Sequence, residues 1–154
     1  MLTESAKIFV KTDRERAQQL VEEAANEARR IEGSMASRPQ AMVAVANALR
    51  VVDPPRVWEA TFDAVKAANS SDVFSGEDGA LLLEFRSKNH SSVGSHDIPQ
   101  FDLDGILREL ANQDYERAVE LARGFEREGP RAVATIAIAR AVLEPQKVIK
   151  DVKK

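Results

Sequence analysis

The residues of this sequence best suited to chemistry are two histidines and a neighbouring aspartate, His90, His96 and Asp97. Imidazole and carboxylate groups could bind a metal ion, and a histidine could act as a general base near neutral pH. Their spacing matches no two-histidine helical metal motif such as HExxH. Histidines in a polar loop are more often solvated or hydrogen-bonded. A small metal-dependent or hydrolytic protein that uses this site is therefore the alternative and not the preferred function.

Other short motifs favour structural roles. Asp102-x-Asp104-Gly105 and Glu77-Asp78-Gly79 resemble fragments of calcium loops, but they lack the third acidic position and the final glutamate. We expect Asp102 or Asp104 to cap a helix that begins near Gly105, and Asp78-Gly79 to form a turn. The sequence has no cysteine, no Gly-x-Ser-x-Gly elbow and no phosphate or dinucleotide loop. It therefore indicates no catalytic residue, metal site or cofactor, and favours a protein that is not an enzyme.

Length and composition are typical of a single helical domain. The chain has 154 residues and a formal net charge of −3, which argues against a nucleic-acid partner. No apolar stretch approaches the ~20 residues of a membrane span, and residues 1–11 lack the features of a signal peptide. We therefore expect no membrane partner and take the cytoplasm as the default compartment, which the sequence does not otherwise define. The 23 alanines, against 5% aromatic residues, favour closely packed helices.

Apolar residues at three- and four-residue steps predict helices over residues 13–32, 41–52, 54–69, 103–112, 114–126 and 132–143. Thr12 with Glu15, and Ser37 with Gln40, have the spacing of capping boxes, and Asp53-Pro54 is typical of a helix start. Segments 41–52 and 132–143 are apolar almost all round, as expected of buried helices. Arg50 and Arg140 lie on these segments. Each should pair with an acidic side chain of a neighbouring helix or line a groove, and pairing is preferred.

Residues 70–101 differ from the rest of the chain, since they hold seven of the ten serines and both histidines. Leu81, Leu83 and Phe85 alternate with Leu82, Glu84 and Arg86, which predicts a short β-hairpin with a turn near residues 88–90. A partly ordered loop is the alternative. A two-stranded ribbon alone cannot bury all of these apolar side chains, so they must pack on the helices or meet another chain. The candidate partner-binding residues are Leu82, Phe85, Arg86, Lys88, His90 and His96.

A block of three helices recurs in the chain. Residues 13–20 (DRERAQQL) match 114–121 (DYERAVEL) at an offset of 101, which also places residues 2–10 on 103–111. Residues 39–54 match 130–145 at an offset of 91. The recurring Asp, Glu and Arg could form a ligand surface, but helix-terminal and solvent-facing roles are preferred. Self-similar helical units are the signature of α-solenoid arrays.

The repeated segments resemble HEAT-like and TPR-like helical repeats. Residues 101–106 (FDLDGI) and 136–144 (IAIARAVLE) are more closely similar to an uncharacterised family of α-helical tandem-repeat proteins from soil bacteria, in which a Gly/Ser-rich insertion interrupts the repeats. The resemblance covers about residues 10–145. It implies a helical-repeat fold and no particular activity. The Trp/Leu/Gly/Tyr spacing of the TPR consensus is itself absent.

The sequence thus predicts an all-α fold of about seven helices, with α-solenoid-like stacked hairpins and a small β-hairpin or ordered loop. Residues 1–154 form one helical-repeat domain, in which the insertion 70–101 separates blocks 2–69 and 102–145. The expected function is a non-enzymatic module that binds a protein or peptide, with self-association through residues 72–98 as one form of it. A structural alternative is one section of a longer repeat array, because apolar residues lie near both ends.

Overall fold

The computed structural model describes residues 2–32, 36–77, 80–87 and 90–144, with backbone alone over the two strands. Seven α-helices, two strands and two short 3-10 turns follow one another within these ranges. In chain order they are α1 (Leu2–Phe9), α2 (Arg14–Arg30), α3 (Ser37–Val52), η1 (Pro54–Arg56), α4 (Val57–Asn69), β1 (Ala80–Ser87), β2 (His90–Asp97), η2 (Pro99–Phe101), α5 (Leu103–Gln113), α6 (Tyr115–Arg123) and α7 (Glu128–Leu143).

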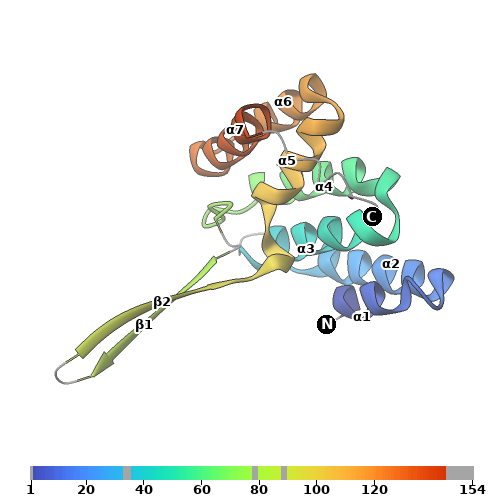
Figure 1. Cartoon of the computed structure of the whole chain (residues 1–154), viewed down its shortest axis with the longest axis horizontal. Coiled ribbons are helices and arrows are strands. Elements are labelled where there is room, and N and C mark those ends of the chain that lie inside the picture. The colour runs from blue at the N-terminus through green and yellow to red at the C-terminus, as the bar shows by residue number, and fades with distance from the viewer. Residues whose placement is uncertain (1, 33–35, 78–79, 88–89, 145–154) are drawn as a thin grey trace, which may run out of the picture.

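The helices form a stack with α1 and α2 at one end, α3 and α4 in the middle, and α5, α6 and α7 at the other end (Figure 1), and α5 packs on α3 and on α7. Alanines make up much of the buried core, and Ala17, Ala46, Ala134 and Ala137 are completely buried. Because a small side chain lets two helix axes come near each other, the alanine content accounts for this packing. The predicted helical fold is confirmed.

Helices α3 and α7 have similar sequences but different surroundings. In α3, which packs against α1, α2, α4 and η2, the side chains of Val45 and Val52 are 3% and 0% exposed. In α7 the positions 91 residues later, Ile136 and Leu143, are 50% and 80% exposed. Among the described elements α7 packs mainly on α5 and α6, and α6 has 9 residues where α2 has 17. The expectation of a buried helix is therefore right for most of α3, apart from the half-exposed Val51, and wrong for α7.

Aspartates begin three of the helices. Asp13 accepts a hydrogen bond from the Arg16 amide at 2.9 Å, Asp114 from the Arg117 amide at 3.0 Å, and Asp102 from the Gly105 amide at 2.8 Å. The roles expected for these three aspartates are confirmed, since each satisfies a first-turn N–H group that has no partner within its helix.

The two predicted capping boxes are not formed. The hydroxyl of Thr12 donates to the Phe9 carbonyl at 3.4 Å, because the carboxylate of Asp13, one residue later, takes the N-cap position. Ser37 is already the first residue of α3, whose N-cap Ala36 offers no side-chain acceptor. Pro54 opens η1, as its fixed φ favours, and α4 begins three residues later at Val57.

Both arginines on the apolar helices pair with α5. The Arg50 Nε atom lies 2.6 Å from Glu109 Oε2, and Arg140 Nη1 lies 3.1 Å from Asp104 Oδ1. Both pairs are partly exposed, so each contributes under about 1 kcal/mol. The predicted structural role of the two arginines is confirmed, and the two pairs link α5 to α3 and to α7.

Candidate interaction surface

Residues 80–97 form a two-stranded antiparallel ribbon that carries most of the candidate partner-binding residues. The strands pair in register from Ala80 with Asp97 to Ser87 with His90. Leu82, Phe85 and Arg86 lie on β1, and His90 and His96 on β2. Lys88 lies outside the described residues. Each strand has 8 residues, so the ribbon is about 26 Å long at ~3.3 Å per residue.

The ribbon projects away from the helical stack, and no described helix packs along its length (Figure 1). Within the described part of the chain its sheet has two strands only, so both outer edges are unpaired. Such edges present free N–H and C=O groups to any chain that can add a strand. Of the two environments expected for this apolar segment, packing along the helices is not what the backbone path shows.

The segment that leads into β1 is fixed to the second helical block. Phe74 is buried, and the Arg127 guanidinium donates to the Asp72 carbonyl at 3.2 Å and pairs with the Asp72 carboxylate. Gly76 has a φ of +85°, and a Cβ atom there would lie 3.3 Å from the Pro130 Cα atom. Glycine is required at this position both by the backbone conformation and by the close approach.

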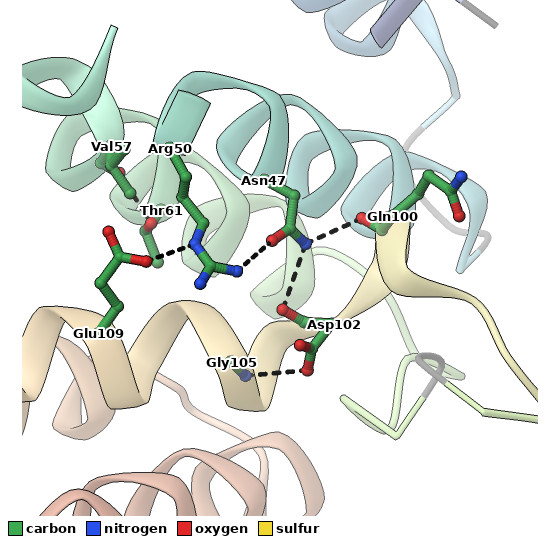
Figure 2. Close-up of polar contacts among 8 residues, drawn as sticks. All are labelled: Asn47, Arg50, Val57, Thr61, Gln100, Asp102, Gly105 and Glu109. Atoms are coloured by element: carbon green, nitrogen blue, oxygen red, sulfur yellow. Dashed lines mark hydrogen bonds and ion pairs between the residues drawn. The ribbon is translucent and has the colours of Figure 1, made fainter. Parts of the chain in front are cut away.

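The segment that follows β2 is fixed to α3 by one buried amide (Figure 2). Asn47, which is 5% exposed, donates from Nδ2 to the carbonyls of Gln100 at 3.0 Å and Asp102 at 3.2 Å. Its Oδ1 atom accepts from Arg50 Nη1 at 3.1 Å, and Arg50 also donates to Glu109. Both ends of the ribbon therefore start from fixed positions on the helical body.

An apolar groove of about 610 Å³ lies at the foot of the ribbon, between α1, α2, α3 and residues 98–101. The apolar residues of its walls include Leu2, Ala28, Ile31, Ala44, Val45, Ile98 and Phe101. Sequence reasoning missed this groove because its walls come from segments far apart in the chain. The available signal was weak: Ile31 and Ile98 are apolar residues at the ends of expected elements.

Two carboxylates, Glu4 and Glu27, are the charged residues of the groove wall. The Lys7 ammonium, which donates to Glu4 Oε1 at 2.8 Å, holds the pKa of Glu4 below its ordinary value, and the Gln100 side chain lowers it further, while burial partly opposes the shift. Glu27 accepts from Arg30 Nη1 at 2.6 Å. Both carboxylates are therefore partly neutralised, which leaves the groove mainly apolar.

The two histidines lie at opposite ends of β2. His96 lies six positions after His90 on the strand, so their backbones are about 20 Å apart at ~3.3 Å per residue. Metal–nitrogen bonds of about 2 Å are too short for one ion to bind both side chains across that span. The arrangement counts against a single metal site built from both histidines. The described side chains contain no group of three or more potential metal ligands, and those of His90, His96 and Asp97 are not among them.

The recurring Arg has a different contact in each block. The Arg117 guanidinium lies over the Trp58 ring, 4.4 Å from its centroid, and joins α6 to α4. The Arg16 guanidinium instead donates to Gln19 on its own helix at 3.3 Å. These different environments count against one ligand surface repeated in both blocks, and agree with structural roles for the set.

None of the helices in the described ranges is long and apolar enough to cross a membrane. Searches against protein-family models, curated proteins and solved structures find no match.

Proposed function

We propose that this chain is a non-enzymatic interaction module whose ribbon, residues 80–97, contacts another protein chain. The observation that carries the proposal is the ribbon itself, which projects from the helical stack with both edges unpaired among the described residues. An isolated two-stranded hairpin is at best marginally stable in water. Pairing with a further strand would satisfy its edge groups and cover the apolar positions of β1.

The charge of the ribbon suggests the chemistry of its partner. Arg86, Lys88 and His90 alternate along the sequence, the backbones of Arg86 and His90 lie at the distal end of the ribbon, and Glu84 is the acidic residue nearest to the three in sequence. The whole chain is acidic, with a formal net charge of −3. A basic tip therefore complements an acidic surface, and a second copy of this chain is the first partner to test.

We further propose that the helical body is an α-solenoid-like repeat of the bacterial family that the sequence resembles. Helices α1–α3 and α5–α7 occur in the same order, and Asp13 and Asp114 cap α2 and α6 with the same geometry. The exposed side of α7 is apolar at Ile136 and Leu143. That side suits the stacking of a further helix, which is the longer-array alternative.

The decisive experiment removes the ribbon and keeps the segments that hold it. Residues 81–96 are replaced by a two-residue Gly-Asn turn that joins Ala80 to Asp97, since these two residues face each other across the ribbon. Residues 72–77 and 98–102 stay, because they pack on the helices. We expect the full chain to self-associate with increasing concentration in light scattering, and the ribbonless chain to remain a monomer of equal thermal stability.

Two point variants sharpen this test. Phe85→Ser should weaken association, whereas Ser91→Ala, in the opposite strand, should leave it unchanged. If both full and ribbonless chains are monomers, and the full chain captures no protein that the ribbonless chain fails to capture, the interaction proposal is wrong.

The alternative, a metal-dependent or hydrolytic protein that uses His90, His96 and Asp97, makes a separate prediction. Divalent ions, Zn²⁺ above all, should raise the melting temperature, and His90→Ala with His96→Ala should abolish the rise. A flat response across divalent ions removes this alternative. The separation of the two histidines along β2 makes the flat response the expected one.

A further inference from the structure

A second hollow lies on the helical body, where α2, α3 and α4 meet. It has a volume of about 220 Å³, and its charged residues are Arg29, Arg38, Asp63 and Lys66. Met42 forms part of an apolar wall. A space of this size suits a small ion or group and excludes a folded partner. The proposed function does not use this hollow.

The hollow carries an excess of positive charge. Asp63 faces two of the three cations, with 3.5 Å from its Oδ2 atom to Arg29 Nη2 and 3.9 Å from its Oδ1 atom to Lys66 Nζ. These distances are long for ion pairs, and one carboxylate offsets one of three positive charges. Two formal positive charges therefore remain beside a partly apolar wall, where an anion interacts more strongly than in bulk water.

Arg38 provides an independent observation. Its Nε atom is buried and has no hydrogen-bond partner among the described residues, and its guanidinium takes part in none of the ion pairs found there. The side chain as a whole is partly exposed and lines the hollow, so its unpaired guanidinium offers hydrogen-bond donors to a group bound there. Arg38 is also the second residue of α3, whose N-cap Ala36 leaves the first-turn N–H groups without a side-chain acceptor. The positive end of the helix dipole adds to the attraction for an anion.

We propose that this hollow binds a dianionic phosphoryl group, either inorganic phosphate or a small phosphate monoester. The Arg38 guanidinium donates the charge-assisted hydrogen bonds that fix the group, and its planar fork suits phosphate oxygens. Arg29 and Lys66 supply the balancing charge, and the Ser70 hydroxyl, which also lines the hollow, is within the same site. The two charges of the ligand match the two uncompensated charges of the protein.

The test is a titration of the full chain with inorganic phosphate, followed by amide NMR shifts and by calorimetry. Phosphoserine forms the second arm, and sodium chloride at equal ionic strength is the blank. We expect saturable shifts centred on Arg38 and Ser70, and an affinity for phosphoserine that is higher at pH 7.5 than at pH 5.5, because the second pKa of phosphate monoesters is near 6. Tighter binding of phosphoserine identifies a monoester site, and tighter binding of phosphate identifies a site for the free ion.

Matched variants decide the role of the cations. Arg38→Gln should weaken phosphate binding at least about tenfold, since it removes the charge and the fork of one cation (~1.4 kcal/mol per tenfold). Lys66→Gln, at a side chain that is 64% exposed and so carries no risk to folding, should weaken it several-fold. Arg30→Gln is the control, because Arg30 lies beside Arg29 on α2 but pairs with Glu27 outside the hollow. Shifts equal to those in chloride, or binding unchanged in both Gln variants, would mean an adventitious ion only and would overturn the proposal.

Discussion

Removal of the Asn47 side-chain amide should destabilise the protein more than any other polar substitution in the described helices. Asn47 is 5% exposed, and its Nδ2 atom donates to two backbone carbonyls of the segment that follows the ribbon. Each such bond contributes about 1 kcal/mol net, and a carbonyl left buried without a donor costs about 1–3 kcal/mol. We therefore expect Asn47→Ala to lower the free energy of unfolding by about 2–4 kcal/mol.

A second variant of Asn47 tests whether the hydrogen bonds donated by its side chain matter more than its shape, and a variant of Asn26 is the control. Asn47→Asp keeps the size and the acceptor for Arg50, but a carboxylate cannot donate to the Gln100 and Asp102 carbonyls. It should cost about 2 kcal/mol, because both donated bonds are lost. Asn26→Ala is the matched control, since Asn26 is exposed on α2 and its side chain accepts a single bond, from Arg29 at 3.2 Å. It should change stability by less than about 0.5 kcal/mol.

The assay is urea unfolding followed by circular dichroism, with the midpoint and slope fitted for each variant. A lower midpoint at an unchanged slope reports stability alone. Native-state hydrogen exchange should also quicken at residues 98–102 in the Asn47 variants, because this amide holds that segment to α3. A loss below about 1 kcal/mol for Asn47→Ala, or wild-type stability for Asn47→Asp, would refute the reasoning.

Four further outcomes can be measured by the same unfolding assay. Asp114→Ala should cost about 1 kcal/mol, because it removes the N-cap of α6; a neutral result would show that water replaces the cap. Arg50→Met should cost about 1–3 kcal/mol, because the buried Asn47 Oδ1 atom loses its donor, whereas the partly exposed pair with Glu109 contributes little. Val52→Ala should cost about 2 kcal/mol, at ~0.8 kcal/mol per methyl group plus a cavity, whereas Leu143→Ala, its counterpart 91 residues later, should cost under about 0.5 kcal/mol. Glu4→Gln should remove a small stabilisation that is present above pH 4.5 and is lost as the pH falls below that value, because the folded pKa of Glu4 is lowered; identical pH profiles of wild type and variant would contradict this assignment.

The helical elements were predictable because their signals are local. The apolar spacing of residues 13–31, the aspartates at positions 13, 102 and 114, and the prolines at positions 54 and 130 each act within one helical turn. The errors at the helix starts were local too. Thr12 and Asp13 are both good N-caps, and the carboxylate of Asp13 took the position, which shifted the helix start by one residue.

The candidate surfaces were harder to predict because their walls come from segments that are far apart in the sequence and meet only in the folded chain. The groove at the foot of the ribbon joins residues 2–4 to residues 98–101, and the phosphate site joins Arg38 to Lys66. No spacing rule connects such positions. Asn47 shows the same limit: it was one of two polar residues on an apolar segment, but its partners, the carbonyls of Gln100 and Asp102, carry no side-chain signal in the sequence.

The comparison of α3 with α7 shows how surroundings, more than sequence, decide what a surface can do. Both helices carry an apolar residue at matched positions, yet Val45 is buried and Ile136 is half exposed. The cause lies in the neighbours, since α2 is long enough to cover α3, whereas α6 ends after 9 residues. A repeat whose covering helix is shortened leaves an apolar face open, and apolar faces of this kind are typical of sites where another chain packs. The ribbon follows the same logic at the level of strands, because an unpaired edge is a place for another chain.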